Sequence, residues 1–182
     1  MNVQEATTRR LPDLKGRYLP ENCRETINTI LKETYGYEQF RNLEIYDDLS
    51  KGKEKLCISQ GQLIENVILE AEKAWKSETQ VDNILLTAPT GSGKSLLFQL
   101  PAIYLGKEYN LLTIVVSPLK ALIVDQVESL QELGYARVAY ASSDLSPEQK
   151  MEVYRQVREG EIDLFYLSPE LLLSYDIKHF VG

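Results

Sequence analysis

The sequence predicts an α/β fold built on a doubly wound, mostly parallel sheet. In residues 81–182, apolar segments of strand length alternate with longer segments whose apolar residues recur at helical spacing. The apolar segments are nearly continuous runs, for example residues 111–117 (LLTIVVS), which is typical of strands buried on both faces. We therefore expect a parallel sheet covered by helices on both faces, with its ligand at the carboxyl ends of the strands.

The N-terminal part, residues 1–80, predicts a mainly helical extension that forms a region of its own. Apolar spacing indicates two amphipathic helices, over residues 21–34 and 62–75. Between them, an aromatic-rich stretch predicts a turn at Gly36 and then a short helix that reaches about residue 48. The run KGKEK at residues 51–55 predicts a charged, solvated loop.

Residues 81–182 are expected to form one lobe in which strands and helices alternate. The strands are expected over residues 84–87, 111–117, 137–141 and 163–168. The helices are expected after residue 93, over residues 119–133 and 147–158, and near residue 170. Ser146 is the expected N-cap of its helix, because a serine hydroxyl can accept from the first backbone amides.

The turn at residues 88–95 (APTGSGKS) has the composition of a phosphate-binding loop. Its glycines let the backbone approach a polyphosphate closely, and the helix that follows directs its positive end to the same place. Lys94 is expected to reach the β- and γ-phosphates as the catalytic lysine, and Ser95 to help bind Mg²⁺. The predicted nucleotide-binding residues of this loop are Ala88, Pro89, Thr90, Gly91, Ser92, Gly93, Lys94 and Ser95.

Composition limits the possible partners. With a net charge of −7 and a pI near 4.9, the chain is not one that binds nucleic acid through bulk positive charge, so such contacts must come from locally placed Lys and Arg. One histidine, His179, and two well-separated cysteines exclude a zinc site. No apolar run has membrane-spanning length, so we expect no membrane partner and a soluble intracellular protein, cytoplasmic or associated with the nucleoid.

Four stretches, in order, resemble the RecQ family of superfamily 2 DNA helicases. The phosphate loop, with Ala88 in place of the usual first glycine, is similar to the A-x-T-G-x-G-K-[ST] form of that superfamily, and the following KSLLFQLPA resembles K-S-L-C-Y-Q-x-P-A. VVSPLKALIVDQVESL (residues 115–130) resembles motif Ia, DLFYLSPELL (163–172) resembles motif Ib, and the polar stretch between them is also similar. The resemblance implies a RecA-like, DEAD/DEAH-type lobe that uses ATP and Mg²⁺, and a second RecA-like lobe in the full-length protein.

Two serine-proline turns are the candidate nucleic-acid contacts. Ser117 and Lys120 fall where a strand ends and a helix begins, so a hydroxyl, backbone N–H groups and one cation can hold a phosphate without reading a base. The alternative that both turns only cap helices stays open. The resemblance implies single-stranded or forked DNA as the partner, contacted through its backbone by Ser117, Pro118, Leu119, Lys120, Ser168, Pro169 and Glu170.

Two stretches compete for the adenine-reading motif, in which the family carries an aromatic residue and an arginine before P-G-Q. Residues 35–44 (YGYEQFRNLE) match the first part but carry N-L-E in place of P-G-Q. Gln62 lies nearer the phosphate loop, and its amide can both donate to and accept from adenine, whereas a carboxylate can only accept. Gln62 is therefore favoured, and Phe40 or Tyr37 could still stack on the base.

Departures from the family keep other functions open. Leu171 stands where motif Ib usually has arginine, and Ala121 where motif Ia often has serine. No Asp-Glu box follows Glu170, so we expect the N-terminal part of a longer helicase, cut within its first motor lobe and hydrolysing little ATP alone. The open alternatives are a nucleotide-dependent regulatory or assembly module without unwinding activity, an RNA helicase, and a translocase that does not unwind.

Overall fold

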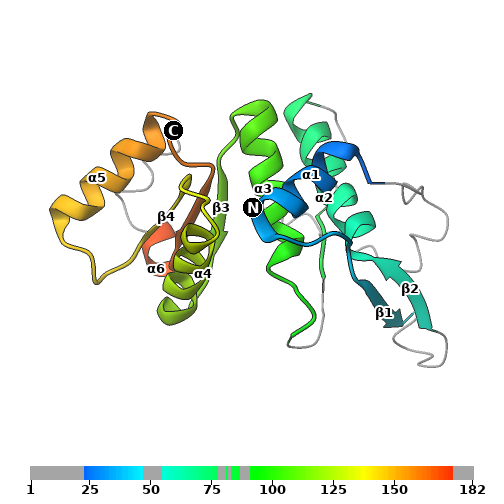
Figure 1. Cartoon of the computed structure of the whole chain (residues 1–182). Helices are drawn as coiled ribbons and strands as arrows, with labels where there is room; N and C mark the ends of the chain where they lie inside the picture. Colours follow the sequence, from blue (N-terminus) through cyan, green and yellow to red (C-terminus); the bar gives the residue numbers. More distant parts are fainter. Residues whose placement is uncertain (1–22, 47–54, 78–80, 82, 87–90, 174–182) are drawn as a thin grey trace, which may run out of the picture. The chain divides into compact units, whose positions relative to one another are not determined.

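The computed structural model describes residues 23–46, 55–77, 81, 83–86 and 91–173 (Figure 1). Its helices are α1 (Glu25–Tyr35), α2 (Gln60–Trp75), α3 (Leu96–Tyr109), α4 (Lys120–Glu132), α5 (Pro147–Arg158) and α6 (Pro169–Leu172). Its strands are β1 (Asn42–Tyr46), β2 (Lys55–Ser59), β3 (Thr113–Val116), β4 (Val138–Ala141) and β5 (Leu164–Leu167). The chain divides into two compact units, residues 1–32 with 37–101 and residues 33–36 with 102–182. None of the described helices is long and apolar enough to cross a membrane.

The second unit contains a three-stranded parallel sheet in the order β3-β5-β4. Val116 of β3 and Ala141 of β4 both pair with Leu167 of β5, so the three strands end at the same level. Every residue of β5 is buried, as expected for a central strand covered on both faces. The predicted parallel sheet is confirmed.

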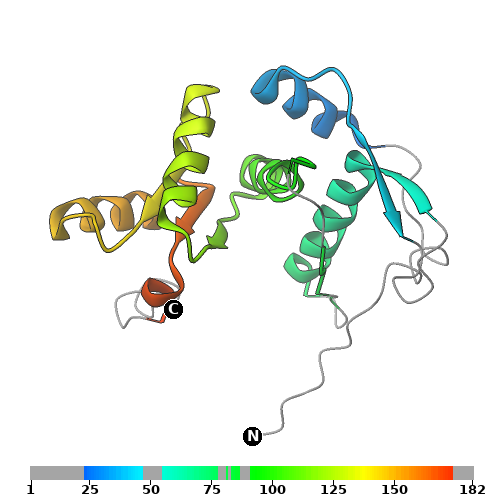
Figure 2. The same cartoon turned by 90° about the horizontal axis from the view of Figure 1, so that it is seen from below.

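Helices cover both faces of this sheet. The connection through α4 leads from β3 at one end of the strand order to β4 at the other. The connection through α5 leads back from β4 to the central strand β5. Right-handed crossovers in opposite directions place their helices on opposite faces, which makes the unit doubly wound (Figures 1 and 2). The α4 side chains that are buried are Ile123, Val127 and Leu130. The buried core that contains Val157 of α5 also includes Ala139, Ala141, Ile162, Phe165 and Leu167.

Asp163, directly before β5, lies buried at the amino edge of the sheet. Its Oδ2 accepts hydrogen bonds from Tyr135 Oη at 2.6 Å and from Arg137 Nε at 2.8 Å, while Oδ1 accepts from Arg137 Nη2 at 2.7 Å. Gly106 of α3 makes a close approach here, because a Cβ at this position would lie 2.3 Å from Asp163 Cγ. Burial of this carboxylate is thus matched by three donors.

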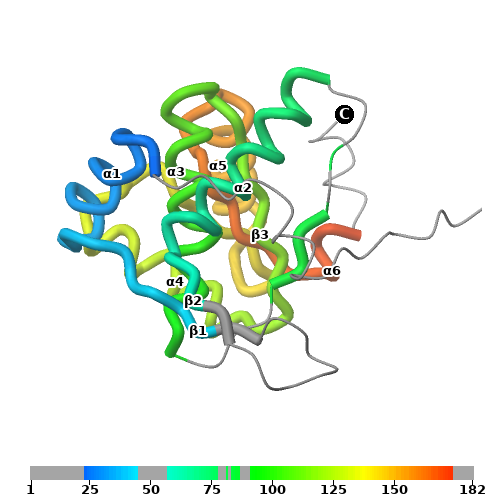
Figure 3. The backbone as a smooth tube through the Cα atoms, turned by 90° about the vertical axis from the view of Figure 1, so that its right-hand side faces the viewer, coloured from blue at the N-terminus to red at the C-terminus, as the bar shows by residue number. Residues whose placement is uncertain are grey.

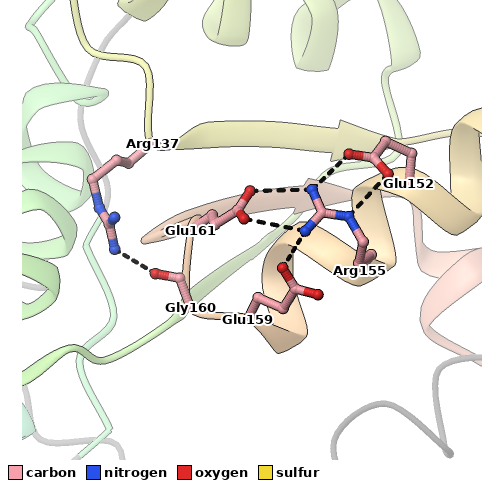
Figure 4. A network of polar contacts seen from close by, with 6 residues as sticks. All are labelled: Arg137, Glu152, Arg155, Glu159, Gly160 and Glu161. Atoms are coloured by element: carbon pink, nitrogen blue, oxygen red, sulfur yellow. Dashed lines mark hydrogen bonds and ion pairs between the residues drawn. The ribbon is translucent and has the colours of Figure 1, made fainter.

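Polar contacts also hold the turn between α5 and β5 (Figure 4). Arg137 Nη2 donates to the carbonyl oxygen of Gly160 at 2.6 Å. On the exposed side of α5, Arg155 pairs with three carboxylates, those of Glu152, Glu159 and Glu161. The Arg137 bond joins this turn to the residue before β4, and the Arg155 pairs tie the last turns of α5 to Glu161 in the turn before β5.

In the first unit, the helices α1 and α2 confirm the two predicted amphipathic helices. Ile64 and Ile68 of α2 are fully buried, as are Ile27 and its neighbours on one face of α1. At the start of α1, Arg24 joins the two helices: Nε lies 2.7 Å from Glu65 Oε1 and Nη1 lies 2.6 Å from Glu72 Oε1. Apolar packing and this three-residue ion cluster hold the helix pair together.

The short helix predicted after Gly36 is wrong, because these residues form the first strand of a hairpin. β1 and β2 pair antiparallel, with Asn42 opposite Ser59 and Tyr46 opposite Lys55. The turn at Gly36 is confirmed by its φ of 69°. A paired strand supplies backbone partners that an isolated short helix cannot. The partner strand β2 begins at Lys55, the last residue of the predicted charged loop, and residues 51–54 of that loop lie outside the described residues. Figure 3 follows the chain from α1 through the hairpin into α2.

The strand predicted over residues 84–87 is also not found in residues 84–86, and residue 87 lies outside the described residues. Residues 83–86 form no strand with any described residue, and Leu85 is 69% exposed. Strand propensity produces a strand only where a neighbour completes the hydrogen bonds. The other predicted elements of residues 91–173 are present with shifted ends, and Ser146 caps α5 by accepting from Gln149 N at 3.3 Å.

Candidate nucleotide site and nucleic-acid interface

The described part of the phosphate loop has the backbone that its glycines predict. Gly91 and Gly93 adopt φ values of 79° and 77°, in the left-handed region that favours glycine. The hydroxyl of Ser92 is buried and has no hydrogen-bond partner among the described residues. An unsatisfied polar atom in a glycine-rich loop fits a phosphate ligand, which would supply an acceptor. Ala88, Pro89 and Thr90 lie outside the described residues.

The loop passes directly into α3. Leu96 N donates to Gly93 O at 3.2 Å and Leu97 N donates to Lys94 O at 3.0 Å, so the first turn already begins in the loop. The first amide groups of a helix have no intrahelical acceptor and carry the positive end of its dipole. Lys94 is exposed and Ser95 is half-buried beside this turn. Both side chains therefore stand where a polyphosphate would meet the helix.

Mg²⁺ in such sites keeps several waters and takes few protein ligands besides the substrate's phosphates. The Ser95 hydroxyl at the start of α3 fits one such ligand position. Among the described residues, no three His, Cys, Asp or Glu side chains are grouped so as to hold a metal ion. The described residues thus offer Mg²⁺ one hydroxyl and no carboxylate cluster.

A second glutamine, Gln60, contacts the phosphate loop and was missed by the sequence reasoning. It is 2% exposed, and its Nε2 donates to Ser92 O at 3.1 Å. Its Oε1 accepts from Arg41 N at 3.1 Å, and its own backbone N donates to Arg41 O at 2.9 Å. Gln60 therefore ties the loop to the end of the 35–41 segment, and it leaves no room for a Cβ on Gly93, which would lie 2.6 Å from Nε2.

Gln62, the predicted adenine reader, takes part in capping α2. Its Oε1 accepts from Ser59 N at 3.0 Å, and the Ser59 hydroxyl caps the same turn. The pattern S-x-x-Q at residues 59–62 is the sequence signature of this capping box. It could have indicated that Gln62 caps the helix and that Gln60 does not. The amide nitrogen of Gln62 has no part in the capping box, so its role towards adenine stays a prediction.

The aromatic residues of the competing stretch differ in their surroundings. Phe40 is half-buried and packs on the start of α2, since a Cβ on Gly61 would lie 2.7 Å from Phe40 Cδ2. Tyr37 is 52% exposed. Phe40 is thus held as a packing residue, while the Tyr37 ring has open surface on which a base could stack.

In the second unit, three serines form a row at the carboxyl edge of the sheet. Ser117, Ser142 and Ser168 each follow the last residue of a strand, and those last residues are paired with one another. Ser117 N donates to Leu167 O at 3.0 Å, which extends the ladder by one residue. The structure thus brings the two predicted serine-proline turns to one edge of the sheet, with β5 carrying one and the adjacent β3 the other.

The hydroxyls of the row are used differently. Ser117 Oγ accepts from Leu119 N at 3.4 Å, and Ser142 Oγ accepts from Asp144 N at 3.3 Å, so neither hydroxyl spends its own hydrogen in that bond. Ser168 instead donates to Glu170, which lowers the pKa of that carboxyl. Because Ser142 and Ser168 are buried, Ser117 is the member of the row best placed to donate to a phosphate.

Other residues of the predicted interface lie on the surface beside this row. Leu119 is 62% exposed, and Pro118 and Glu170 are also exposed, whereas Pro169 is half-buried at the start of α6. Lys120, the predicted cation, is exposed at the start of α4, and its Nζ lies 2.9 Å from Asp144 Oδ1. The edge therefore presents hydroxyl, amide and ammonium donors together with two carboxylates.

Comparison with known proteins places this arrangement in a family. The family model described as DEAD/DEAH box helicase matches residues 68–180, more than half of the chain. The chain belongs to the DEAD/DEAH box helicase family. The match covers both the phosphate loop and the serine row, and it agrees with a RecA-like α/β lobe.

Among DEAD/DEAH box helicases, the chain resembles the RecQ proteins, as its motifs predict. It is 34% identical over 151 residues to the ATP-dependent DNA helicase RecQ of Synechocystis sp., covering 83% of this chain and 25% of that protein. It is 32% identical over 148 residues to the ATP-dependent DNA helicase RecQ of Bacillus subtilis, covering 81% and 20%. The chain thus spans about a quarter or less of the length of these relatives.

A solved structure supports the fold of this DEAD/DEAH box helicase chain. The DUF1998 helicase MrfA, in a crystal structure bound to DNA, aligns with a TM-score of 0.53 and 21% identity over 91% of this chain and 20% of that one. At this identity the likeness concerns the fold alone. It confirms the predicted α/β fold.

Proposed function

We propose that this chain is the ATP-binding first lobe of a RecQ-like DNA helicase, which in its full-length form couples ATP hydrolysis to movement on single-stranded DNA. The observation that carries the proposal is the glycine-rich loop that passes into α3, in a chain of the DEAD/DEAH box helicase family. The similarity to RecQ helicases favours DNA over RNA as the partner. A lobe of this kind acts inside the cell, and we infer an intracellular location.

At the nucleotide, the chain's own residues would bind and orient. Lys94 would pair with the β- and γ-phosphates, the amides of the first turn of α3 would hold their oxygens, and Ser95 would hold Mg²⁺. The metal ion, when bound, neutralises charge that develops on the transferred phosphoryl group. Gln60 keeps the loop backbone in place, and Gln62 or Tyr37 would contact the adenine.

At the nucleic acid, the carboxyl edge of the sheet would hold the backbone of one strand. Ser117 can donate its hydroxyl hydrogen, and Lys120 supplies the cation, while Ser168 and the amides after it offer a second place one strand away. Such contacts fix position without reading sequence. In the full-length protein, a second RecA-like lobe would close on ATP and open after hydrolysis, which would step the motor along DNA.

Replacing Lys94 by Ala tests the nucleotide site. Loss of one charge-assisted contact should weaken binding of a fluorescent ATP analogue to this chain by about 10- to 100-fold, with an unchanged circular dichroism spectrum. The matched control is Lys107→Ala, because Lys107 lies exposed in the last turn of the same helix. Equal affinity of the Lys94 variant and the wild type would overturn the site. In the full-length protein, the same change should abolish ATP hydrolysis.

Competition between DNA and RNA tests the partner. A labelled oligothymidylate bound to the chain should be displaced more readily by unlabelled DNA than by the matching RNA, and Lys120→Ala should weaken binding by about two- to fivefold at low salt. Lys107→Ala is again the control. A preference for RNA would favour an RNA helicase, and ATP binding with no nucleic-acid binding at all would favour a nucleotide-dependent regulatory module. Strand displacement by the full-length protein separates a helicase from a translocase.

A further inference from the structure

The cation of the proposed interface, Lys120, is already engaged by the chain itself. Its Nζ lies 2.9 Å from Asp144 Oδ1 and also donates to the hydroxyl of Ser143. Ser143 Oγ in turn lies 3.3 Å from the same carboxylate oxygen. Both partners come from the turn between β4 and α5, more than twenty residues further along the chain. Two of the three ammonium hydrogens are therefore used by one short turn.

The position of this ion pair matters because it spans the sheet's carboxyl edge. Lys120 follows β3 and Asp144 follows β4, and β5 lies between these two strands. The pair thus lies across the end of β5, where Ser168 begins the turn into α6. The charge of Lys120 also acts on Glu170, whose pKa it helps to lower. Lys120 therefore faces two carboxylates, one in contact and one nearby, at the place where a phosphate is proposed to bind.

We propose that Asp144 is an internal competitor for Lys120, so that a nucleic-acid phosphate binds this edge by displacing the Asp144 carboxylate. The inference rests on the proposed nucleic-acid role of the edge and adds the residue that regulates its affinity. A phosphate on the remaining hydrogen of Nζ would bring two anions close to one cation, and the like charges would repel. The carboxylate must therefore move away as the phosphate arrives.

The exposure of the pair makes this exchange possible. The side chains of Lys120 and Asp144 are 46% and 71% exposed. Solvent-exposed ion pairs of this kind are weak. When a phosphate displaces the Asp144 carboxylate, water can solvate that carboxylate at little cost in free energy. The Ser143 hydroxyl, which no longer donates to Asp144, can then donate to the phosphate. In a chain with a net charge of −7, the ammonium group of Lys120 would thereby stay covered until a polyanion with several contacts arrives.

The test is binding of a fluorescent oligothymidylate to the whole chain at low salt, measured by anisotropy. Asp144→Asn removes the competing charge and keeps the shape, and it should tighten binding by about two- to fivefold. The matched control, Asp125→Asn, removes the same charge from an exposed position on α4 and should change binding less than Asp144→Asn does. In the Lys120→Ala background, Asp144→Asn should tighten binding no more than Asp125→Asn does, because the cation that Asp144 competes for is gone.

Each result decides between the proposals. Equal tightening by Asp144→Asn and Asp125→Asn would mean a general effect of charge and would overturn the competitor. Weaker binding by Asp144→Asn would mean that Asp144 positions Lys120, which also overturns it. If Lys120→Ala weakens binding but Asp144→Asn does not change it, the result supports the nucleic-acid interface and overturns the role of Asp144 as a competitor. If neither the wild type nor Asp144→Asn binds the oligonucleotide, the proposed interface itself fails, and the competitor with it.

Discussion

The two edges of the parallel sheet each carry an ion pair between a basic residue and an aspartate, and the pairs differ in burial. At the amino edge, Arg137 holds Asp163 through two hydrogen bonds of 2.7 and 2.8 Å, and the Asp163 side chain is 2% exposed. At the carboxyl edge, Lys120 lies 2.9 Å from Asp144, whose side chain is 71% exposed. The distances are similar, so the environment and not the contact length separates the two pairs.

This difference predicts that the amino edge serves stability and that the carboxyl edge serves the proposed binding. The buried carboxylate has three donors and a glycine packed against it, so no other group can replace its partners without leaving charge unsatisfied. The exposed carboxylate can exchange its partner for water or for a phosphate. We therefore expect substitutions at the amino edge to change the free energy of unfolding and substitutions at the carboxyl edge to change affinity.

The largest expected effect comes from Asp163→Ala. Removing the carboxylate leaves the buried Tyr135 hydroxyl without its acceptor and takes the carboxylate from Arg137, which keeps its bond to the Gly160 carbonyl. The free energy of unfolding should fall by about 2 to 3 kcal/mol. The loss is below that of a fully buried pair because the Arg137 side chain is 44% exposed. Urea unfolding followed by circular dichroism measures it. Asp144→Ala, measured alongside, should leave the free energy of unfolding close to that of the wild type, because the exposed carboxylate loses little when its partner is replaced by water. Equal losses for the two variants would end the distinction between the edges.

A smaller effect is expected for Tyr135→Phe, which sharpens the comparison by removing one donor and no charge. The ring stays buried, but Asp163 loses the hydrogen bond from Tyr135 Oη, and the free energy of unfolding should fall by about 1 kcal/mol. Burial, followed by the hydrogen bond to Asp163, raises the pKa of Tyr135, so the hydroxyl stays a donor at neutral pH. Tyr140→Phe on β4 is the matched control. A neutral result at Tyr135 would mean that the arginine alone satisfies Asp163.

The two thiols of the first unit also differ in burial. Here we expect burial to change the reactivity of the thiol and not the stability of the protein. Cys57 is exposed, whereas burial raises the pKa of Cys23 to about 12, and its Sγ lies 3.3 Å from Gly61 O. The Cys23 thiol stays protonated below that pH, so its thiolate, the reactive form, is scarce at about pH 8.5. Iodoacetamide should therefore modify Cys57 and spare Cys23, as read by peptide mass spectrometry. Modification of both at one rate in the folded chain would contradict the burial of Cys23.

The lobe and its parallel sheet could be predicted because their signals are local. Continuous apolar runs predict β3 and β5, a serine-proline pair predicts the start of α5, and the phosphate loop predicts that a helix, α3, follows it. The hairpin β1–β2 could not be predicted in this way, since its strands are joined by a charged run and each depends on the other for hydrogen bonds. The segment 83–86 shows the reverse case, a strand-like sequence without a described partner.

The sites were predictable in position and not in their contacts. Residue types placed Lys94, Ser117 and Lys120 at the ends of strands and helices, where the structure also has them, while their ligands stay a prediction. The contact of Gln60 with the Ser92 carbonyl joins residues 32 apart, and the pair of Lys120 and Asp144 joins residues 24 apart. Neither has a sequence pattern, because each depends on how distant elements pack. The capping box was the one local signal that could have separated Gln60 from Gln62.

The closed base of the hairpin means that insertions between β1 and β2 should be tolerated without moving the ends of the hairpin. Arg41 and Gln60 are already joined by hydrogen bonds in both directions, so the chain enters and leaves the hairpin at one point. The entropy of closing a loop grows only slowly with its length, by about 0.6 kcal/mol for each doubling. A protein engineer could therefore insert residues between β1 and β2, for example an epitope or a fluorophore site, while the Ser59 cap of α2 and the contact of Gln60 with the phosphate loop are kept.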